Sequence, residues 1–433
     1  MLSHTTWLEV HAEKLDPALN GELSGAYRSQ NWMPGFLERP VRNIRDLLNK
    51  KSVIVQLEPG HWVNGLNTDN LGGAMGCIID HRLESIDCFS TTVNVTKLQS
   101  LVSHDAVAKI WQDREVKTCL DVATPVVNAP KVWQGGARGE GVGIAILDTG
   151  IYPHPDLVTP NSRIVAFKDF IDFRLRPYDD NGHGTHCAGD AAGNGTKSKG
   201  SYSGPAPKAK LIGVKVLGKK GSGNMSSILA GIQWCIINKD KYGIRVLSMS
   251  IGSKATASYK SDLLCRAVQK AWKAGIVVCV AAGNEGPGTG TISSPGIEPQ
   301  VITVGALDDK NSVSRARNTL AGFSSRGPTI DGLTKPDVVA PGVNIISLRV
   351  PGSFLDRGTK LSKVGQWYIS MSGTSMATPV CAGVAALLLC SHPGLTPNQV
   401  KNLLMGSCRT ISGDPNAQGA GLVDAWAAGE LAK

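Results

Sequence analysis

The feature that most constrains the fold is the alternation of short apolar runs with longer amphipathic stretches from Val142 onward. The apolar runs are "VGIAIL", "KLIGVKVL", "RVLSMSI", "GIVVCVAA" and "QVITVGA", all rich in β-branched side chains. Between them, "SSILAGIQWCIINKD" and "SDLLCRAVQKAWKAG" carry apolar residues at helical spacing. Strands separated by such helices predict an α/β fold with a doubly wound, mostly parallel sheet. In such sheets, functional groups gather at the carboxyl ends of the strands.

The N-terminal part of the chain has a different pattern. "SVIVQLEP" and "ESIDCFSTTVNV" predict strands, and "TKLQSLVSHDAVAKIW" predicts a helix that begins at Thr96. We therefore expect residues 50–118 to form a small α+β domain, which the linker "KTCLDVATPVVNAP" joins to a larger domain of residues 119–433. Residues 1–49 are a weakly patterned N-terminal extension without an assigned role.

Charge and composition narrow the classes of partner. The whole chain has a net charge of +10, of which residues 119–433 carry +12 and residues 1–118 carry −2, so the two parts should attract one another. The basic residues are scattered, without a dense run or interleaved aromatic residues, so we expect no nucleic-acid partner. No stretch reaches the roughly 18 apolar residues that span a bilayer, so we expect no membrane association.

The cysteines and the start of the chain bear on its location. The first residues lack the basic segment and apolar core of a secretory signal. The 10 cysteines are too few for a disulfide scaffold, and several lie inside apolar runs. We therefore expect a cytoplasmic protein with reduced thiols.

Ser375 stands at an unusual junction. In "SGTSMATPVCAGVAALLLC" it lies between a glycine-bearing turn and an apolar run, residues 380–389, that predicts a buried helix. A serine at a helix start can cap free backbone N–H groups. Alternatively it can act as a nucleophile, because a helix N-terminus stabilises developing negative charge. The second interpretation requires partner residues.

Those partners occur at predicted strand ends and glycine-rich turns. Asp148 ends the first strand, His183 lies in "NGHGTHCAG", and Asn284 follows the run "VCVAAG". Each alone could be a turn or loop residue. Together, serine could attack a carbonyl, histidine could accept its proton, and aspartate could fix the imidazole. The Asn284 amide could join the Ser375 N–H in holding an oxyanion.

The chain order Asp, His, Ser and the motifs "AILDTGI", "NGHGTHCAG", "AAGNEG" and "SGTSMATP" resemble the subtilisin family of serine proteases, from about Val142 to the C-terminus. The N-terminal unit and the missing signal are most similar to its intracellular AprX-type alkaline members. The resemblance implies a serine endopeptidase with Asp148, His183 and Ser375 as the triad and Asn284 as oxyanion donor. Surface insertions are expected near residues 308–319 and 351–366.

The resemblance also implies how protein or peptide substrates bind. The walls of the pocket for the residue before the scissile bond, the P1 residue, would be Ser250, Ile251, Gly252, Ala281, Ala282 and Gly283. The opposite edge, which pairs with an extended substrate backbone, would be Gly221, Ser222 and Gly223. Small residues on these walls imply an open, mainly apolar pocket and broad specificity, and Glu285 at its mouth could accept a basic side chain.

Further expectations concern regulation and cofactors. Residues 50–118 resemble an inhibitory propeptide, so the protein would be a self-processed zymogen cleaved near residues 117–121, with its own N-terminal domain as a partner. The chemistry requires no cofactor, although Asp156 in "HPDL" matches a position that helps hold structural calcium in some subtilisins. Cys187 follows His183 by one helical turn, so its thiol should lie close to the imidazole.

Three other enzyme classes fit the sequence less well. A metal enzyme that uses His183, His186 and Cys187 would lack the H-E-x-x-H arrangement. "GVKVLGKK" approaches a phosphate-binding loop, but Lys220 stands where serine or threonine is needed. "GTSMA" approaches the α/β-hydrolase motif, but that family requires an acid and then a histidine after the serine, and only His392 follows. A non-catalytic interaction protein would not need the complete set of catalytic groups.

Overall fold

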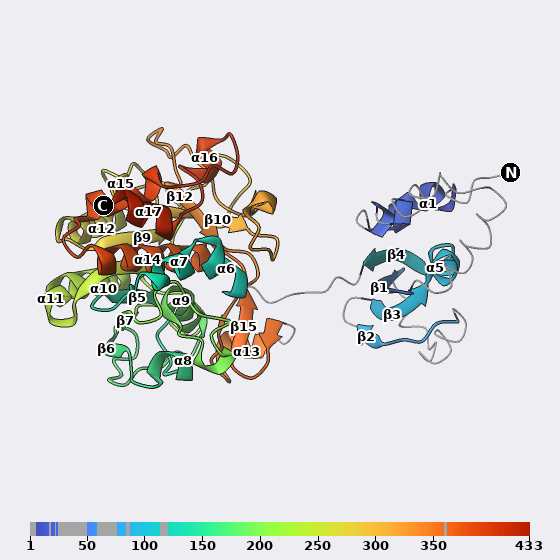
Figure 1. Ribbon diagram of the computed structural model, residues 1–433, viewed down its shortest axis with the longest axis horizontal. Coiled ribbons are helices and arrows are strands. Elements are labelled where there is room, and N and C mark those ends of the chain that lie inside the picture. The colour runs from blue at the N-terminus through green and yellow to red at the C-terminus, as the bar shows by residue number, and fades with distance from the viewer. Residues whose placement is uncertain are drawn as a thin grey trace. The chain divides into compact units, whose positions relative to one another are not determined.

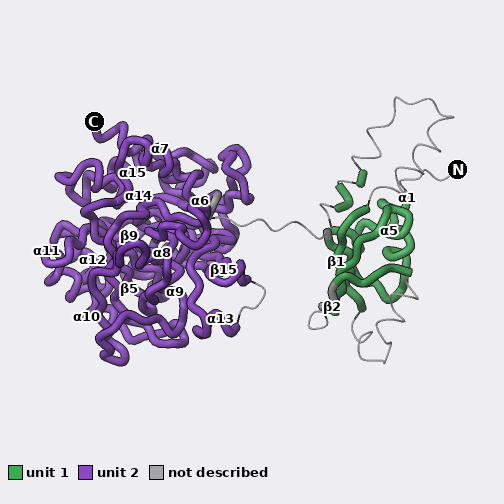
Figure 2. The backbone as a smooth tube through the Cα atoms, turned by 60° about the horizontal axis from the view of Figure 1, so that its bottom comes forward, with its two compact units in different colours: residues 1–116 green, residues 117–433 purple. Residues whose placement is uncertain are grey.

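The computed structural model describes residues 6–16, 19–21, 23–24, 50–58, 76–83, 87–112, 120–358 and 362–433. The chain divides into two compact units, residues 1–116 and residues 117–433, which Figure 2 colours green and purple. Each unit has a hydrophobic core of its own.

The smaller unit is built on an antiparallel sheet with the strand order β2-β3-β1-β4. Its elements are α1 (Thr6–Val10), β1 (Lys50–Leu57), β2 (His81–Leu83), β3 (Cys88–Asn94), α5 (Val95–Val102) and β4 (Val107–Gln112). Alternate residues of β1, among them Val53 and Val55, are buried against Phe89 and Leu98. The α+β character of this unit follows from that alternation.

The helix predicted through Trp111 is wrong in its second half. The helix α5 ends at Val102, and the residues from Val107 form β4, in which Ile110 pairs with Val55 of β1. Its N-cap is Asn94, whose side chain accepts a hydrogen bond from Lys97 N at 2.9 Å. The apolar residues after this turn fit the spacing of a helix as well as that of a strand. Their pairing with the distant strand β1 makes them a strand.

Part of the N-terminal extension contributes to the same core. Leu8, Leu15, Leu19 and Leu23 are buried together with Phe89 of β3. The described residues before β1 are therefore packed against the sheet of the smaller unit.

The larger unit is organised around an eight-stranded sheet with the order β11-β10-β9-β8-β5-β7-β6, in which β12 also pairs with β10. All of these pairings are parallel except β10 with β11. The strands are β5 (Gly143–Asp148), β6 (Ile164–Asp169), β7 (Lys210–Lys215), β8 (Ile244–Met249), β9 (Val277–Ala281), β10 (Ile302–Asp308), β11 (Thr319–Leu320) and β12 (Val338–Pro341). A small antiparallel sheet contains β13 (Ile345–Leu348), β15 (Tyr368–Met371) and β14 (Lys363–Val364).

Helices pack on both faces of the parallel sheet (Figure 1). The helices are α6 (Leu120–Val126), α7 (Ala129–Gln134), α8 (Pro155–Val158), α9 (His183–Ala192), α10 (Met225–Ile237), α11 (Lys239–Tyr242), α12 (Leu263–Lys273), α13 (Phe354–Gly358), α14 (Thr374–Ser391), α15 (Pro397–Gly406), α16 (Pro415–Gln418) and α17 (Ala425–Leu431). On β5, Leu147 faces Gly231 of α10, and the next residue, Asp148, faces Gly184 of α9. Helix α14 packs with α9, and α12 packs with α10. The predicted doubly wound α/β fold is confirmed.

Two segments need comment. The predicted linker is partly wrong, because α6 begins at Leu120 and α7 follows from Ala129; residues 113–119, with most of the expected processing region, lie outside the described residues. Helix α14 is long and apolar enough to cross a membrane by length and composition, but 83% of it is buried inside the protein. It is the central core helix of the larger unit.

Candidate active site

The predicted catalytic residues meet where strands of the sheet end and two helices begin. Asp148 is the last residue of β5, His183 is the first residue of α9, and Ser375 is the second residue of α14. His183, Ser375 and Asn284 line a cavity of about 640 Å³, and Asp148 lies fully buried beside His183. The fold therefore brings together four residues that are far apart in the sequence.

The imidazole of His183 is held by the carboxylate of Asp148. Nδ1 of His183 lies 2.7 Å from Oδ1 of Asp148, and the His183 side chain keeps 19% of its surface exposed to the cavity. Oδ1 of Asp148 also accepts a hydrogen bond from Thr149 N at 2.7 Å, whereas its buried Oδ2 has no hydrogen-bond partner. Because Nδ1 faces a carboxylate, it carries the proton, and Nε2 of the neutral ring is the free base.

Two opposing effects act on the pKa of His183. Burial lowers the pKa, but the charge of Asp148, its hydrogen bond and the neighbouring Cys187 raise it more, so the pKa lies well above the ordinary value of 6.5. Burial also raises the pKa of the Cys187 thiol to about 11, so that thiol is neutral. Because the neutral thiol carries no charge, the Asp148 carboxylate is the main group that raises the pKa of His183.

The thiol of Cys187 lies close to the imidazole of His183, as its spacing in the sequence predicted. Its Sγ is 3.8 Å from Nδ1 of His183 and donates to the carbonyl oxygen of Ser375 at 3.5 Å. Cys187 is fully buried. It is thus a neutral packing residue beneath the imidazole.

The capping interpretation of Ser375 is wrong. Helix α14 has Gly373 as its N-cap and no side-chain capping hydrogen bond. The hydroxyl of Ser375 instead donates to the carbonyl oxygen of Ser250 at 3.2 Å and makes no hydrogen bond to His183. In free enzymes, hydrogen bonds between catalytic groups are often long and tighten when the substrate binds.

Asn284 is oriented through its oxygen. Its Oδ1 accepts hydrogen bonds from Thr374 N at 2.9 Å and from Thr374 Oγ1 at 3.0 Å. Because the amide is planar, its NH₂ group then points to the other side, next to Gly373 and the start of α14. Asn284 and the N-terminus of α14 can therefore direct N–H groups at the same oxygen.

Most of the predicted substrate-binding residues line the cavity. They are Ser250, Ile251, Gly252, Ala281, Gly283, Gly221, Ser222 and Gly223, and the exposed Glu285 joins them. Gly283 has φ +111°, and a Cβ there would lie 2.4 Å from Ser293 Oγ, so only glycine fits this wall.

Ala282 is the exception. It is fully buried and packs behind the wall with Cys265, Ile292 and Ile297. Successive residues of an extended segment point to opposite sides, so neighbours of two lining residues can face away from the cavity.

A polar network that the sequence did not predict holds the Asp148 and His183 segments together. Asp179 accepts five hydrogen bonds: from Thr149 Oγ1, from the backbone N–H groups of Asn181 and Gly182, and from both N–H and Oγ1 of Thr185. Thr149 follows Asp148, and the other donors flank His183. One buried carboxylate therefore fixes both sides of the Asp148–His183 pair.

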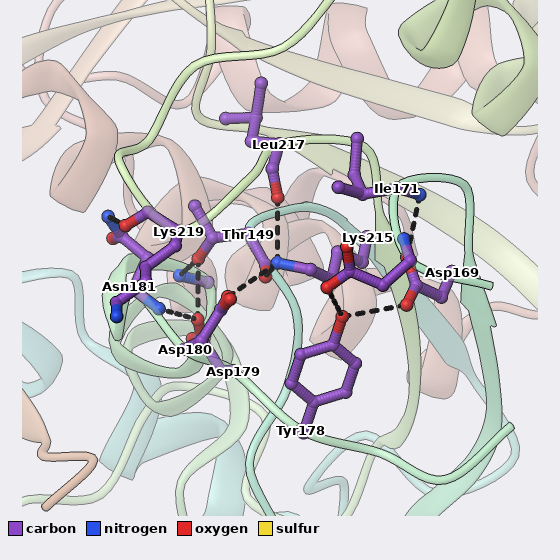
Figure 3. A network of polar contacts seen from close by, with 12 residues as sticks. Thr149, Asp169, Ile171, Tyr178, Asp179, Asp180, Asn181, Lys215, Leu217 and Lys219 are labelled. Atoms are coloured by element: carbon purple, nitrogen blue, oxygen red, sulfur yellow. Dashed lines mark hydrogen bonds and ion pairs between the residues drawn. The ribbon is translucent and has the colours of Figure 1, made fainter. Parts of the chain in front are cut away.

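Lys215 reinforces this junction, as Figure 3 shows. Its ammonium group is fully buried and donates to the Thr149 carbonyl at 2.6 Å, the Leu217 carbonyl at 2.9 Å and Oδ1 of Asp180 at 2.8 Å. Lys215 pairs with Asp148 across β5 and β7. All three donors of the ammonium are used, so it ties together three chain segments around the site.

Asp156 does not fit the expected calcium site. Its Oδ1 accepts a hydrogen bond from Lys197 N at 2.8 Å, and its Oδ2 accepts one from the Tyr368 hydroxyl at 2.7 Å. Its carbonyl oxygen accepts from the buried guanidinium of Arg163 at 2.5 Å. Calcium needs six to eight oxygen ligands, and these oxygens already serve protein donors, one of them a cation.

The imidazole of His186 binds other groups and does not form a ligand cluster with His183 and Cys187, as a metal enzyme would require. Its Nδ1 lies 2.9 Å from Oδ2 of Asp190, and its Nε2 faces the carbonyl oxygens of Ile345 and Ile369. Within the described ranges, Asp148, His183 and Cys187 are the group with the composition of a metal site. The first two already contact one another through His183 Nδ1 and Asp148 Oδ1.

Other residues on the cavity walls gave no signal in the sequence. They include Leu217, Met249, Leu264, Phe354, Leu355 and Met371. Asp179 had a weak signal, since it precedes the glycine-flanked histidine in "YDDNGHG". Aliphatic and aromatic residues of a wall cannot be told from core residues by sequence alone.

Comparisons with known proteins identify the family of the chain. Residues 139–421 match the model of the peptidase S8 (subtilase) family. The chain is 48% identical over 429 residues, 96% of each chain, to serine protease AprX of Bacillus subtilis (strain 168). It is 38% identical over 302 residues to subtilisin Savinase of Lederbergia lenta, covering 70% of this chain and 96% of the relative.

Solved structures show the same fold. Sphericase superposes with a TM-score of 0.54 and 32% sequence identity, over 66% of this chain and 92% of that chain. A cold adapted subtilisin-like serine proteinase superposes with a TM-score of 0.51 and 31% identity, over 65% and 88%. The chain therefore belongs to the subtilase family: it is a subtilisin-like serine protease, a hydrolase that acts on peptide bonds.

Proposed function

We propose that the protein is an endopeptidase in which Ser375 is the nucleophile, His183 the general base and acid, and Asp148 the residue that orients the imidazole. The observation that carries the proposal is the 2.7 Å contact between His183 Nδ1 and Asp148 Oδ1 beside a cavity that Ser375 and Asn284 also line. No cofactor takes part in the steps.

In the first half-reaction, Ser375 Oγ forms a bond to the scissile carbonyl carbon while His183 Nε2 accepts the hydroxyl proton. The charge that develops on the carbonyl oxygen is stabilised by Asn284 Nδ2 and by the Ser375 N–H at the start of α14. The C–N bond then breaks, and His183 donates its proton to the leaving amine. Water attacks the acyl-enzyme in the same way and releases Ser375.

Specificity is proposed to be broad, with a mainly apolar P1 pocket. Its walls are small residues, and the backbone groups of residues 221–223 and 250–252, which line the cavity, can bind the main chain of many sequences. Glu285 at the mouth would favour a basic side chain. Equal hydrolysis of matched peptides with lysine or glutamine at P1 would remove that part of the proposal.

We further propose that the protein is made as a zymogen with the smaller unit, residues 50–118 together with packed residues of the extension, as its propeptide. A separate core in that unit supports an independent role. A cytoplasmic location is supported by the free thiols of buried cysteines such as Cys187, Cys235 and Cys265, as expected in a reducing compartment. Neither nucleic acid nor a membrane is part of the proposed function.

The test compares wild type with Ser375→Ala. We expect wild type to hydrolyse casein and to appear as a processed chain. The variant should stay full length and lose about 10⁶-fold in activity, the size of loss when a subtilisin loses its serine. Casein hydrolysis by Ser375→Ala at the wild-type rate would refute the nucleophile, and processing of the variant in pure form would refute self-cleavage.

A further inference from the structure

The segment before and within α13 lies on the wall of the catalytic cavity. The sequence predicts only a surface insertion at residues 351–366, yet Phe354 and Leu355 line the cavity. Their backbone N–H groups donate to the carbonyl oxygens of Asp180 at 2.9 Å and Asn181 at 3.0 Å. These two residues come shortly before His183 in the chain. The segment is thus attached to the loop that carries the catalytic imidazole.

Further contacts hold this segment in place. A Cβ on Gly182 would lie 2.8 Å from Ser353 Oγ, so the segment packs directly against the backbone next to His183. On the other side, the buried Asp356 is bound by Arg349 at 2.5 and 3.2 Å, by Gly352 N at 2.8 Å and by Lys363 at 3.1 Å. A wall fixed in this way needs little ordering when a ligand binds.

The contacts of Asn181 show on which side of His183 this wall stands. The side chain of Asn181 donates to the Lys219 carbonyl at 2.8 Å, so it reaches the loop that continues to Gly221. Its own carbonyl oxygen faces Leu355 instead. The proposed P1 walls come from the ends of β8 and β9. The loop before His183 therefore contacts the α13 wall through its carbonyl oxygens and the Gly221 edge through the Asn181 side chain.

The leaving amine must receive its proton from the imidazole on the side away from the residues before the scissile bond. Phe354 keeps 45% of its surface exposed on the cavity wall, and Leu355 and Met371 add further apolar wall. We infer that Phe354 and Leu355 form a subsite for an apolar side chain on the residue directly after the scissile bond. This inference rests on the proposed acyl-enzyme mechanism.

Acyl transfer isolates this subsite from the P1 pocket. A peptide ester first acylates Ser375 and releases its alcohol. An amino-acid amide then attacks the acyl carbon: the C–N bond forms, the C–Oγ bond breaks, and the amine proton passes through His183 to Oγ. The amide occupies the position of the residue after the scissile bond. The ratio of transfer to leucinamide over glycinamide, measured within one enzyme, reports only that position.

We expect wild type to prefer leucinamide and Phe354→Ala to lose roughly five- to tenfold of that preference, as for an apolar contact in a half-open site. Phe354→Leu should keep most of it. Phe173→Ala is the matched control, because Phe173 is 73% exposed and is not among the cavity-lining residues, and it should keep the wild-type ratio.

An unchanged ratio in Phe354→Ala would overturn the subsite. The subsite would also be overturned if Phe354→Ala changed the preference for the residue before P1, measured with peptides that differ at that residue. If wild type does not release the alcohol from the ester, the proposed mechanism is wrong, and the subsite that rests on it is wrong too. The two failures are distinguishable because alcohol release is measured before any amide is added.

Discussion

At the scale of single residues, the proposed mechanism makes activity depend on the hydrogen bond between Asp148 and His183. The carboxylate overcomes the effect of burial and raises the pKa of His183 well above 6.5. A general base must be neutral, so the fraction of active enzyme grows as pH rises through that raised pKa. The unperturbed value would put the rise near 6.5.

We therefore predict that kcat/KM increases with pH along a limb whose midpoint lies above 6.5, which a pH series on one peptide substrate measures. Asp148→Asn removes the charge that raises the pKa. The limb should then move to lower pH, and activity should fall about 10⁴-fold because the tautomer is no longer fixed. A profile that is flat between pH 5 and 8 in wild type would exclude His183 as the base.

Cys187 gives a second prediction at this scale. Its Sγ lies 3.8 Å from His183 Nδ1 and bonds to the Ser375 carbonyl, so a mercury atom on this sulfur would displace both segments. A mercurial should inhibit wild type and Cys235→Ala alike, because Cys235 is buried in α10 away from the cavity wall. Cys187→Ala should be active and resistant. Full mercury sensitivity of Cys187→Ala would show that another thiol is responsible.

At the scale of elements, the Asp179 carboxylate and the Lys215 ammonium join the end of β5 to the start of α9. Neither residue would touch the reacting atoms of the substrate. Both instead hold Thr149 and the loop before His183 in place. The junction is buried, so its hydrogen bonds cannot be replaced by water without cost.

Asp179→Asn keeps the shape but replaces one acceptor oxygen by an NH₂ group that faces N–H and O–H donors. We expect kcat to fall about 10²-fold, the effect of a displacement near 1 Å. The acid limb should also move toward 6.5 as the Asp148–His183 contact loosens. A merely structural role would lower the melting temperature and leave the pH profile of the folded enzyme unchanged.

Tyr178→Phe is the control for the same network. The single proton of the Tyr178 hydroxyl is shared between Oδ2 of Asp169 at 2.8 Å and Oδ2 of Asp172 at 2.9 Å, so its loss leaves the Asp179 contacts intact. Figure 3 shows Tyr178 and Asp169 beside Lys215. This variant should keep the wild-type pH profile. Lys215→Met should instead lower the free energy of unfolding by about 3 kcal/mol, because it breaks a buried ion pair and leaves two carbonyls without donors.

The elements also show how far sequence reasoning reaches. Strands β5, β7, β8, β9 and β10 could be predicted because they are buried on both faces and read as continuous apolar runs. The candidate residues Asp148, His183, Ser375 and Asn284 could be proposed from the sequence because they lie at strand ends and beside glycine-rich turns. Strand β4 was missed because its pairing with β1 is a long-range contact. The position of α13 on the cavity depends on tertiary hydrogen bonds to Asp180 and Asn181, which no local pattern reveals.

At the scale of the whole molecule, the chain consists of a slightly acidic smaller unit and a basic larger one, each with its own core. If the smaller unit inhibits the larger one, part of their attraction is electrostatic and is screened by salt. Inhibition of the processed protease by added residues 1–118 should weaken as ionic strength rises from about 0.01 to about 1 M.

A neutral peptide aldehyde provides the control, since its inhibition constant should change little over the same range. Equal inhibition by the smaller unit at low and high salt would show that electrostatic attraction does not contribute. No inhibition at either salt concentration would refute the proposed propeptide role.

The central claim is that Asp148 and His183 activate one serine out of all those in the chain. The most direct measurement is labelling with a fluorophosphonate, followed by mass spectrometry of the peptide that contains Ser375. Wild type should carry one label, on Ser375, and His183→Ala should be labelled at least about 10³-fold more slowly. A label on another residue, or equal labelling of His183→Ala, would contradict the account.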